Sequence, residues 1–383
     1  MGVDVSLSKE REKELRALVA ETTKDLDLAP GDIVLGADIA TETPRTSTGI
    51  LALDVALGGG LPLDQWTEIV GHESSGKTAT TMQIVAQQQR MYPDWVCAWV
   101  AAEAFDAEFA LMNGLDLDRI LLIPINAMEE AFEAVIRAME RRAVDGVVID
   151  SFPALVPTGE YAREMMDGQQ PGVGAKLFNQ FFRKIQKAAR RSLITEDRHW
   201  LGIIINQWRE QIGISFGDPR TTPGGKGKNY SYYVRIEVAR EEWIDNGLTK
   251  RDKVIVGQKI RLKIFKNKSG PPQRVCHYDL YVDNHKDFEP GDIDVVADIF
   301  NTAEALGVVG RAEEGTSYFV LSSGEKIGGN RPASLKKLAT DPELAETVQR
   351  EVLATMSRKV PAAPPLPKPP PKKTTSRVKV KRS

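Results

Sequence analysis

The chain has 383 residues, of which 42% are hydrophobic and 27% are charged, and its formal net charge is −2. A chain of this length and composition can bury one large hydrophobic core and carry smaller appendages. No run approaches the roughly 20 apolar residues of a membrane span. The charged N-terminus does not resemble a secretory signal. We therefore expect a cytoplasmic protein with no membrane contact, whose affinity for any nucleic acid would come from local clusters of cations.

The first predicted element is a one-sided helix within residues 8–28. Its apolar positions recur at helical spacing in an otherwise charged segment, and they are Leu15, Leu18, Val19 and Leu26. Pro30 ends this pattern. A helix with one apolar face can lie on its own domain or dock on a neighbouring subunit, and the sequence leaves both alternatives open. We expect residues 1–35 to form this N-terminal arm.

Between residues 66 and 282, short β-rich runs alternate with segments of helical length, which is typical of an α/β domain. The β-rich runs are residues 66–70, 96–100, 120–124, 146–150, 201–206, 234–238 and 260–265. Because helical segments such as 78–91 and 129–142 join the early runs, we expect a largely parallel sheet. The late runs follow one another without helices, which predicts an antiparallel extension. The expected core spans residues 36–288.

A smaller unit and a tail follow the core. Residues 295–306 and 342–356 have helical patterns and residues 317–326 have the pattern of a hairpin, which predicts a small α+β domain over residues 289–358. Residues 359–383 are rich in proline and lysine and contain no acidic residue. Such a segment cannot bury apolar surface, so we expect a disordered basic tail.

A phosphate-binding motif follows the first β-rich run. The Walker A pattern G-x-x-x-x-G-K-[ST] is matched by Gly71, His72, Glu73, Ser74, Ser75, Gly76, Lys77 and Thr78. Loops of this kind turn consecutive backbone N–H groups toward phosphates, and the following helix adds its positive end. We expect Lys77 to supply charge to the β and γ phosphates of ATP and the Thr78 hydroxyl to ligate Mg²⁺.

Two acidic residues follow neighbouring predicted strands. Asp150 ends the apolar run 146–150, and an acid at this position completes the Mg²⁺ site of a Walker A loop. Glu103 follows the run 96–100 at the same sheet edge, where a carboxylate could polarise a water in line with the γ phosphate. Taken alone, Glu103 equally fits an ordinary surface glutamate.

Further motifs occur in a fixed order along the chain. They are Ser47-Thr48-Gly49, Leu53-Asp54, the run 56–62, the Walker A box, Val148-Ile149-Asp150-Ser151, Ile205-Asn206-Gln207, the run 216–219, Thr221-Thr222 with Gly224-Gly225, and Lys266-Asn267-Lys268. This order resembles that of the bacterial RecA recombinases over about residues 9–356.

The resemblance implies a RecA-like P-loop NTPase core with a mostly parallel sheet, an N-terminal helix arm and a small α+β C-terminal domain. It implies an ATP- and Mg²⁺-dependent recombinase that forms helical homo-oligomeric filaments on single-stranded DNA, pairs them with homologous duplex DNA, exchanges strands and hydrolyses ATP when DNA is bound. A single-strand-binding protein and a LexA-type repressor of the SOS response become candidate partners.

The resemblance also implies roles for residues around the nucleotide. It makes Glu103 the catalytic glutamate and Gln207 the residue that senses the γ phosphate and passes the signal to the DNA loops. Asp106 and Phe109 match positions that contact adenine, with Phe109 in place of a stacking tyrosine. His72 stands where a proline is common, and we expect it to act as a backbone spacer.

A lysine pair ends the run 260–265. Lys266 and Lys268 alternate with Asn267, so they point to the same side of an extended chain. The residues alone fit a solvated surface pair. The resemblance places them across the filament interface, facing the γ phosphate of the next subunit, where they would act like arginine fingers.

Two DNA loops are implied by the resemblance, residues 160–174 and residues 208–229. The residues that it assigns to DNA contact are Lys176, Asn179 and Arg183 on the helix after the first loop, and Arg209, Ile212, Thr222, Gly224 and Gly225 in the second. Contacts of this kind with the DNA backbone give affinity without base readout, as a homology search by base pairing requires. Without the resemblance, Lys176 and Arg183 would fit a solvated helix face.

Two alternative functions remain open from the sequence. The first is another motor on the same fold, an accessory ATPase or helicase, against which the lysine pair and the long glycine-bearing loop argue. The second is a recombination mediator that binds DNA and nucleotide but hydrolyses weakly, against which Lys77, Glu103 and Gln207 argue.

Overall fold

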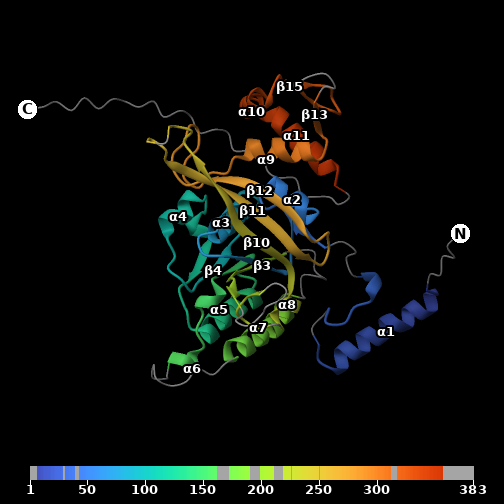
Figure 1. The fold of residues 1–383 in the computed structure, drawn as a ribbon. Coiled ribbons are helices and arrows are strands. Elements are labelled where there is room, and N and C mark those ends of the chain that lie inside the picture. Colours follow the sequence, from blue (N-terminus) through green and yellow to red (C-terminus); the bar gives the residue numbers. More distant parts are fainter. Residues whose placement is uncertain are drawn as a thin grey trace, which may run out of the picture.

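A computed structural model describes residues 7–28, 31–38, 43–161, 172–189, 199–210, 219–225, 227–249, 251–311 and 317–356. Figure 1 shows a central α/β body, a smaller unit formed by the C-terminal elements, and an N-terminal helix set apart from both. Among the described residues, no helix is both long and apolar enough to cross a bilayer.

The central sheet has eight strands in the order β12-β11-β10-β3-β7-β6-β4-β5. Their bounds are β3 Trp66–Gly71, β4 Cys97–Ala101, β5 Ile120–Ile123, β6 Gly146–Asp150, β7 Leu201–Gln207, β10 Tyr232–Asp245, β11 Ile255–Asn267 and β12 Arg274–Tyr281. The pairs from β5 to β10 are parallel, and β10, β11 and β12 pair antiparallel. The predicted parallel sheet with an antiparallel extension is confirmed, although β12 is absent from the predicted runs.

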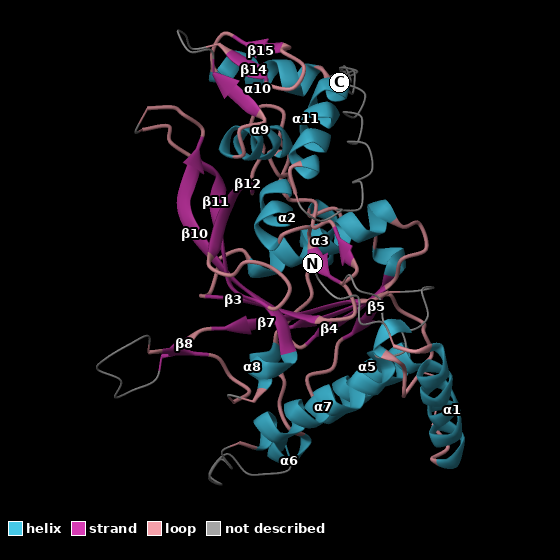
Figure 2. Ribbon diagram, turned by 90° about the vertical axis from the view of Figure 1, so that its right-hand side faces the viewer, coloured by secondary structure: helices cyan, strands magenta, loops and turns pink. Residues whose placement is uncertain are grey.

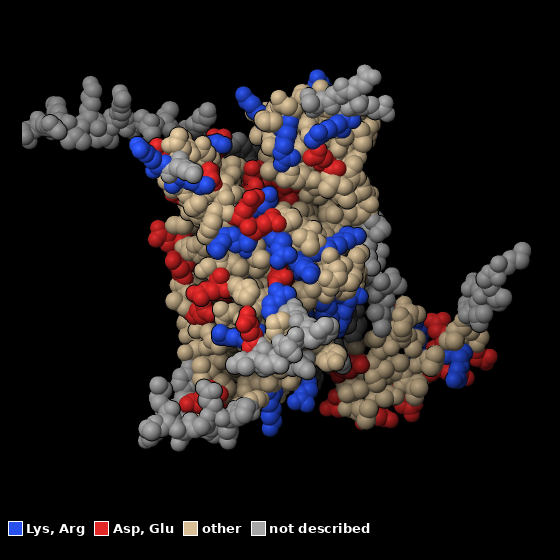
Figure 3. Space-filling model, in the orientation of Figure 1, with Lys and Arg blue, Asp and Glu red and all other residues tan. Residues whose placement is uncertain are grey.

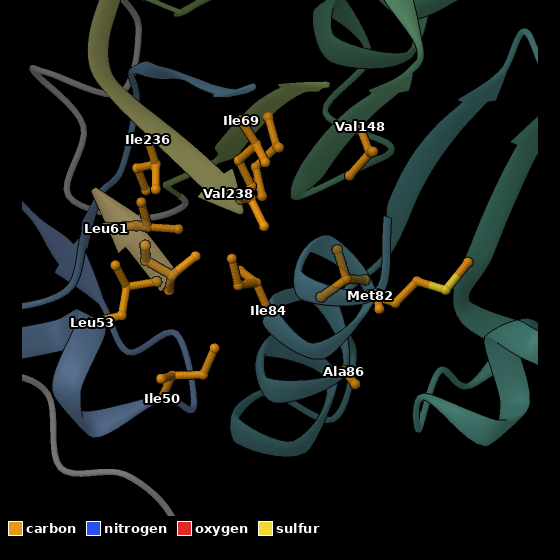
Figure 4. Close-up of a cluster of buried hydrophobic side chains, with 14 of the residues drawn as sticks. Ile50, Leu53, Leu61, Ile69, Met82, Ile84, Ala86, Val148, Ile236 and Val238 are labelled. Carbon is orange, nitrogen blue, oxygen red and sulfur yellow. The ribbon is translucent and has the colours of Figure 1, made fainter. Parts of the chain in front are cut away.

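Helices cover both faces of the parallel strands, which explains why those strands are apolar throughout. On one face lies α3 Lys77–Met91, and on the other lie α5 Met128–Glu140 and α7 Val173–Ala189 (Figure 2). Val148 of β6 packs in the cluster that includes Met82 of α3, which Figure 4 shows. Its neighbour Val147 packs with Phe132 and Phe178 of α5 and α7. Alternate side chains of one strand thus anchor the two helical layers.

The C-terminal unit has its own core around α9 Val295–Ala305. Its other elements are β13 Val309–Arg311, β14 Tyr318–Val320, β15 Lys326–Gly328, α10 Arg331–Thr340 and α11 Pro342–Ala354. The predicted hairpin and both predicted helices are present, whereas α10 was not predicted. Asp298 of α9 accepts hydrogen bonds from the backbone nitrogens of Leu51 and Ala52, at 2.6 and 3.0 Å, and so caps α2 Leu51–Leu57 of the main body.

The remaining elements are short. They are β1 Arg45–Thr46, β2 Leu61–Pro62, α4 Ala107–Met112, α6 Thr158–Tyr161, β8 Arg209–Glu210, β9 Arg220–Thr221 and α8 Lys228–Ser231. The predicted N-terminal helix is α1 Lys9–Asp25, which Ser8 caps. None of its residues is buried, and Leu18 is 56% exposed. Leu26 is 63% exposed as well, whereas Leu15 and Val19 are half-buried, so part of the apolar face remains open to solvent.

Candidate nucleotide and DNA sites

The Walker A loop connects β3 to α3 at the carboxyl edge of the sheet, where phosphates bind in folds of this class. Two of its glycines are required by their surroundings. A Cβ atom on Gly71 would overlap the backbone oxygen of Val238, and one on Gly76 would lie 2.6 Å from Cδ1 of Ile260. Gly76 also has a φ of 92°, which disfavours any side chain. The loop therefore packs closely against β10 and β11.

Two predicted ligand residues meet directly behind this loop. The Thr78 hydroxyl donates a hydrogen bond of 3.1 Å to Oδ2 of Asp150, the last residue of β6. The Lys77 ammonium donates to the backbone oxygen of His72 at 2.6 Å. Burial lowers the pKa of Lys77, against the opposing charges of Asp150 and Glu103. His72 thus contacts Lys77 through its backbone oxygen, and its role as a backbone spacer stays a prediction.

Glu103 and Gln207 lie at the same edge of the sheet. Glu103 follows β4, and its Oε1 accepts a hydrogen bond of 2.6 Å from the hydroxyl of Ser151, the residue after Asp150. Gln207 ends β7, where it stands in register with Gly71 of β3. Because β4, β6, β7 and β3 are parallel, their carboxyl ends bring these residues around one space.

The carboxyl group of the partly buried Asp150 has a raised pKa of about 6, because loss of hydration disfavours its ionised form and the charge of Glu103 adds to this effect. We expect Asp150→Asn to stabilise the nucleotide-free protein at about pH 8 by about 3 kcal/mol, the equivalent of roughly two pKa units. Above pH 6 the carboxyl group is ionised in both the folded and unfolded states. The folded state then bears the full unfavourable free energy of holding this charge away from water.

This advantage of Asp150→Asn should shrink as the pH falls from about 6 to about 4, because the folded protein then takes up the proton before the unfolded chain does. Urea unfolding of both proteins across this range measures the difference. Asp118→Asn, at an exposed position, is the matched control. A stability gap that does not change with pH would contradict the raised pKa.

A cavity of about 430 Å³ opens beside the Walker A loop. Residues Ser74 to Ala79 line it, together with Phe109, which was predicted to contact adenine. Asp106 is not among the lining residues, and its carboxylate caps α4 by accepting a hydrogen bond of 3.0 Å from the Phe109 nitrogen. Tyr281 also lines the cavity and stacks on Phe288 at 4.0 Å. The sequence missed Tyr281 because the run that became β12 was not predicted.

Lys266 lies near the end of β11 and Lys268 directly follows this strand, and both amines reach backbone oxygens at or just before the start of β10. Lys268 donates to the backbone oxygen of Tyr230 at 3.0 Å, and Lys266 donates to that of Tyr232 at 2.7 Å. Burial and the neighbouring charge of Lys268 lower the pKa of Lys266 to about 8. Neither amine lines the cavity of its own chain, so the pair is free of the nucleotide site in the single subunit.

The first set of predicted DNA residues lies on α7. Lys176 and Arg183 are exposed, whereas Asn179 is half-buried and donates a hydrogen bond of 2.9 Å to the backbone oxygen of Ala175. Most of the first predicted loop, residues 162–171, lies outside the described residues.

The second predicted loop has more structure than its composition indicates. Its first residues form β8 and pair with β9 further along the loop, with Arg209 opposite Thr221. Thr222 is buried, and its hydroxyl accepts a hydrogen bond of 2.6 Å from Lys228, which is itself buried. Gly224 and Gly225 have φ values of 98° and 74°. Ile212 lies outside the described residues.

Comparisons with known proteins agree with this arrangement. A family model described as the RecA N-terminal domain matches residues 17–285. The chain is 35% identical over 363 residues to "Protein RecA" of Thermus thermophilus, which covers 94% of this chain and 98% of the relative. It is 34% identical to "Protein RecA" of Haemophilus ducreyi over 347 residues, covering 90% and 86%, and to that of Synechococcus elongatus over 349 residues, covering 91% and 90%.

Proposed function

The chain belongs to the RecA family, and from that premise we propose how its residues bind ATP and DNA. It is a recombinase with DNA-dependent ATPase activity, and its family binds ATP with Mg²⁺. The observation that carries the assignment of residues is the convergence of Lys77, Thr78, Asp150, Glu103 and Gln207 on one edge of the sheet.

The residues present fit a phosphate and a hard cation. The Ser75 hydroxyl oxygen is buried in the Walker A loop and has no hydrogen-bond partner among the described residues, so it has capacity left for a ligand. Thr78 and Asp150 would hold Mg²⁺, which neutralises charge between the β and γ phosphates when bound. Lys77 would exchange the His72 carbonyl for a phosphate oxygen, a stronger charge-assisted partner.

Glu103 is proposed as the residue that orients the attacking water. The Ser151 hydroxyl donates its hydrogen bond to Oε1 of Glu103. Within the described part of the chain, the second carboxylate oxygen, Oε2, therefore remains available for the water. Fixing one oxygen holds the carboxylate in a single orientation, which lowers the cost of positioning the water. Gln207 would sense the γ phosphate next to Gly71 and transmit its presence to β8, which begins two residues later.

DNA would bind along the surface that joins α7 to the second loop. Figure 3 shows Lys and Arg side chains interspersed with Asp and Glu near the middle of the face on which β10 and β11 lie, so this face has no cluster of cations alone. The proposed footprint depends instead on exposed cations of α7 and β8. Lys176, Arg183 and Arg209 would contact phosphates, and Gly224 and Gly225 would offer backbone N–H groups.

Filament assembly is proposed to use α1 and the lysine pair. Of the two alternatives left by the sequence, docking of α1 on the next subunit gives its exposed apolar face a partner. Lys266 and Lys268 would then reach the nucleotide of that neighbour. A cytoplasmic location and contacts with a single-strand-binding protein or a LexA-type repressor remain predictions.

Phosphate release with and without single-stranded DNA, combined with electron microscopy, tests this function. We expect DNA to stimulate phosphate release, and helical filaments to form with a slowly hydrolysed ATP analogue. Closed rings would favour the helicase alternative. Filaments without stimulated phosphate release would favour the weakly hydrolysing mediator.

A further inference from the structure

Arg240 and Trp243 of β10 lie outside every predicted site and line the same cavity as the Walker A loop. The Arg240 guanidinium stacks over the Trp243 indole, 4.0 Å from the ring centroid. Its Nη1 also donates a long hydrogen bond of 3.4 Å to the backbone oxygen of Ser74. A guanidinium has five N–H donors, so one long bond to a neutral oxygen leaves capacity for an anion.

A β-bulge places both side chains on the face of β10 that carries the cavity. Residues three apart on a regular strand point to opposite faces. In the register with β11, however, Arg240 and Glu242 pair with consecutive residues, so Glu241 is an extra residue in β10. Because of this extra residue, Arg240 and Trp243 point to the same side of the sheet. Bulges that redirect a side chain in this way are common beside active sites.

The β11 residues opposite the pair confirm which side this is. Ile260 pairs with Arg240, and Gln258 pairs with Trp243. A Cβ atom on Gly76 would contact both Ile260 and Gln258, so this side faces the Walker A loop.

Arg240 differs from neighbouring cations in its ion pairing. On the adjacent strand, Lys259 pairs with Glu242 at 3.1 Å and Arg261 pairs with Glu237 at 3.7 Å. No carboxylate in the described part of the chain lies within ion-pair distance of Arg240, whose contacts there are Ser74 and Trp243. Trp243 is 49% exposed, so much of its ring remains available to a ligand.

We propose that Arg240 and Trp243 bind the nucleoside triphosphate directly. Arg240 donates to the phosphates beside Ser74, and Trp243 packs against the nucleoside part. This inference rests on the proposed binding of ATP by the Walker A loop. Arg240 would be a cation of the subunit that holds the nucleotide, whereas Lys266 and Lys268 would come from the neighbouring subunit.

Calorimetric titration of the full chain with a slowly hydrolysed ATP analogue, without DNA, tests the inference. Arg240→Gln should weaken binding about tenfold, the value of one lost charge-assisted hydrogen bond. Trp243→Ala should weaken binding several-fold, and Trp243→Phe should restore most of it because an aromatic face remains. Lys259→Gln removes the same charge from the next strand and should bind as the wild type does.

A second readout uses fluorescence. The analogue should change the tryptophan emission of the wild type, and this change should be lost in Trp243→Phe. Wild-type affinity in both Arg240→Gln and Trp243→Ala would overturn the inference. Lys77→Ala separates this failure from that of the proposed function, because nucleotide binding that survives Lys77→Ala unchanged would instead refute the Walker A site.

Discussion

Glu103→Gln is expected to bind ATP and DNA as the wild type does and to hydrolyse ATP roughly a thousandfold more slowly, within the range of a lost general base. Glutamine keeps the size of the side chain and can still accept the Ser151 hydrogen bond of 2.6 Å. It cannot take a proton from the attacking water. Binding and turnover should therefore separate, and phosphate release at saturating ATP and single-stranded DNA measures the loss.

Glu108→Gln is the matched control for this substitution. Glu108 is an exposed acid of the nearby helix α4, and its replacement should leave turnover unchanged. Normal phosphate release by Glu103→Gln would remove Glu103 from the catalytic residues and leave Ser151 with a purely structural partner.

Lys266→Ala/Lys268→Ala is expected to lose about a thousandfold of DNA-dependent turnover, the scale of an arginine finger. The free subunit should bind nucleotide normally, because neither lysine lines its own cavity. In the single chain both amines donate to neutral backbone oxygens of residues 229–232, and burial lowers the pKa of Lys266 to about 8. A phosphate from a neighbour would favour the charged form and supply a stronger partner.

Lys253→Ala/Lys259→Ala removes one lysine from the β10–β11 connection and one from β11, and serves as the control. Both of these lysines form ion pairs with acids of β10, at 2.8 and 3.1 Å, so they are already neutralised. Their loss should cost little turnover. An equal loss in both double variants would attribute the effect to general charge or to stability.

Local patterns indicated the phosphate-binding loop and the acids expected near it. The Walker A loop has a fixed spacing, and Asp150 and Glu103 each follow an apolar run, so a parallel sheet places both acids at its carboxyl edge. The catalytic role of Glu103 came only from the resemblance, because its local sequence equally fits a surface glutamate. Strand alternation predicted that Lys266 and Lys268 point to one side, whereas their role toward the ATP of a neighbouring subunit came from the resemblance. The local patterns depend on residues close in sequence, which explains why the sequence reveals them.

Features that depend on register or on distant partners were not predictable. Arg240 and Trp243 share a face only because β10 has a bulge, and no local pattern shows which residue is extra. Asp298 caps a helix some 250 residues away in the chain, at Leu51 and Ala52. Burial raises the pKa of its carboxyl to about 7. Such contacts appear only when the chain is folded.

The measurement that tests the shared ATP site most directly mixes two nearly inactive proteins. Lys266→Ala/Lys268→Ala and Glu103→Gln are combined in equal amounts on single-stranded DNA, and phosphate release is recorded. In a head-to-tail filament, roughly a quarter of the randomly mixed interfaces would join an intact Glu103 site to intact lysines. Activity should therefore recover to about that fraction of the wild-type rate. No recovery, with co-assembly of the two proteins demonstrated, would contradict an ATP site completed by the neighbouring subunit.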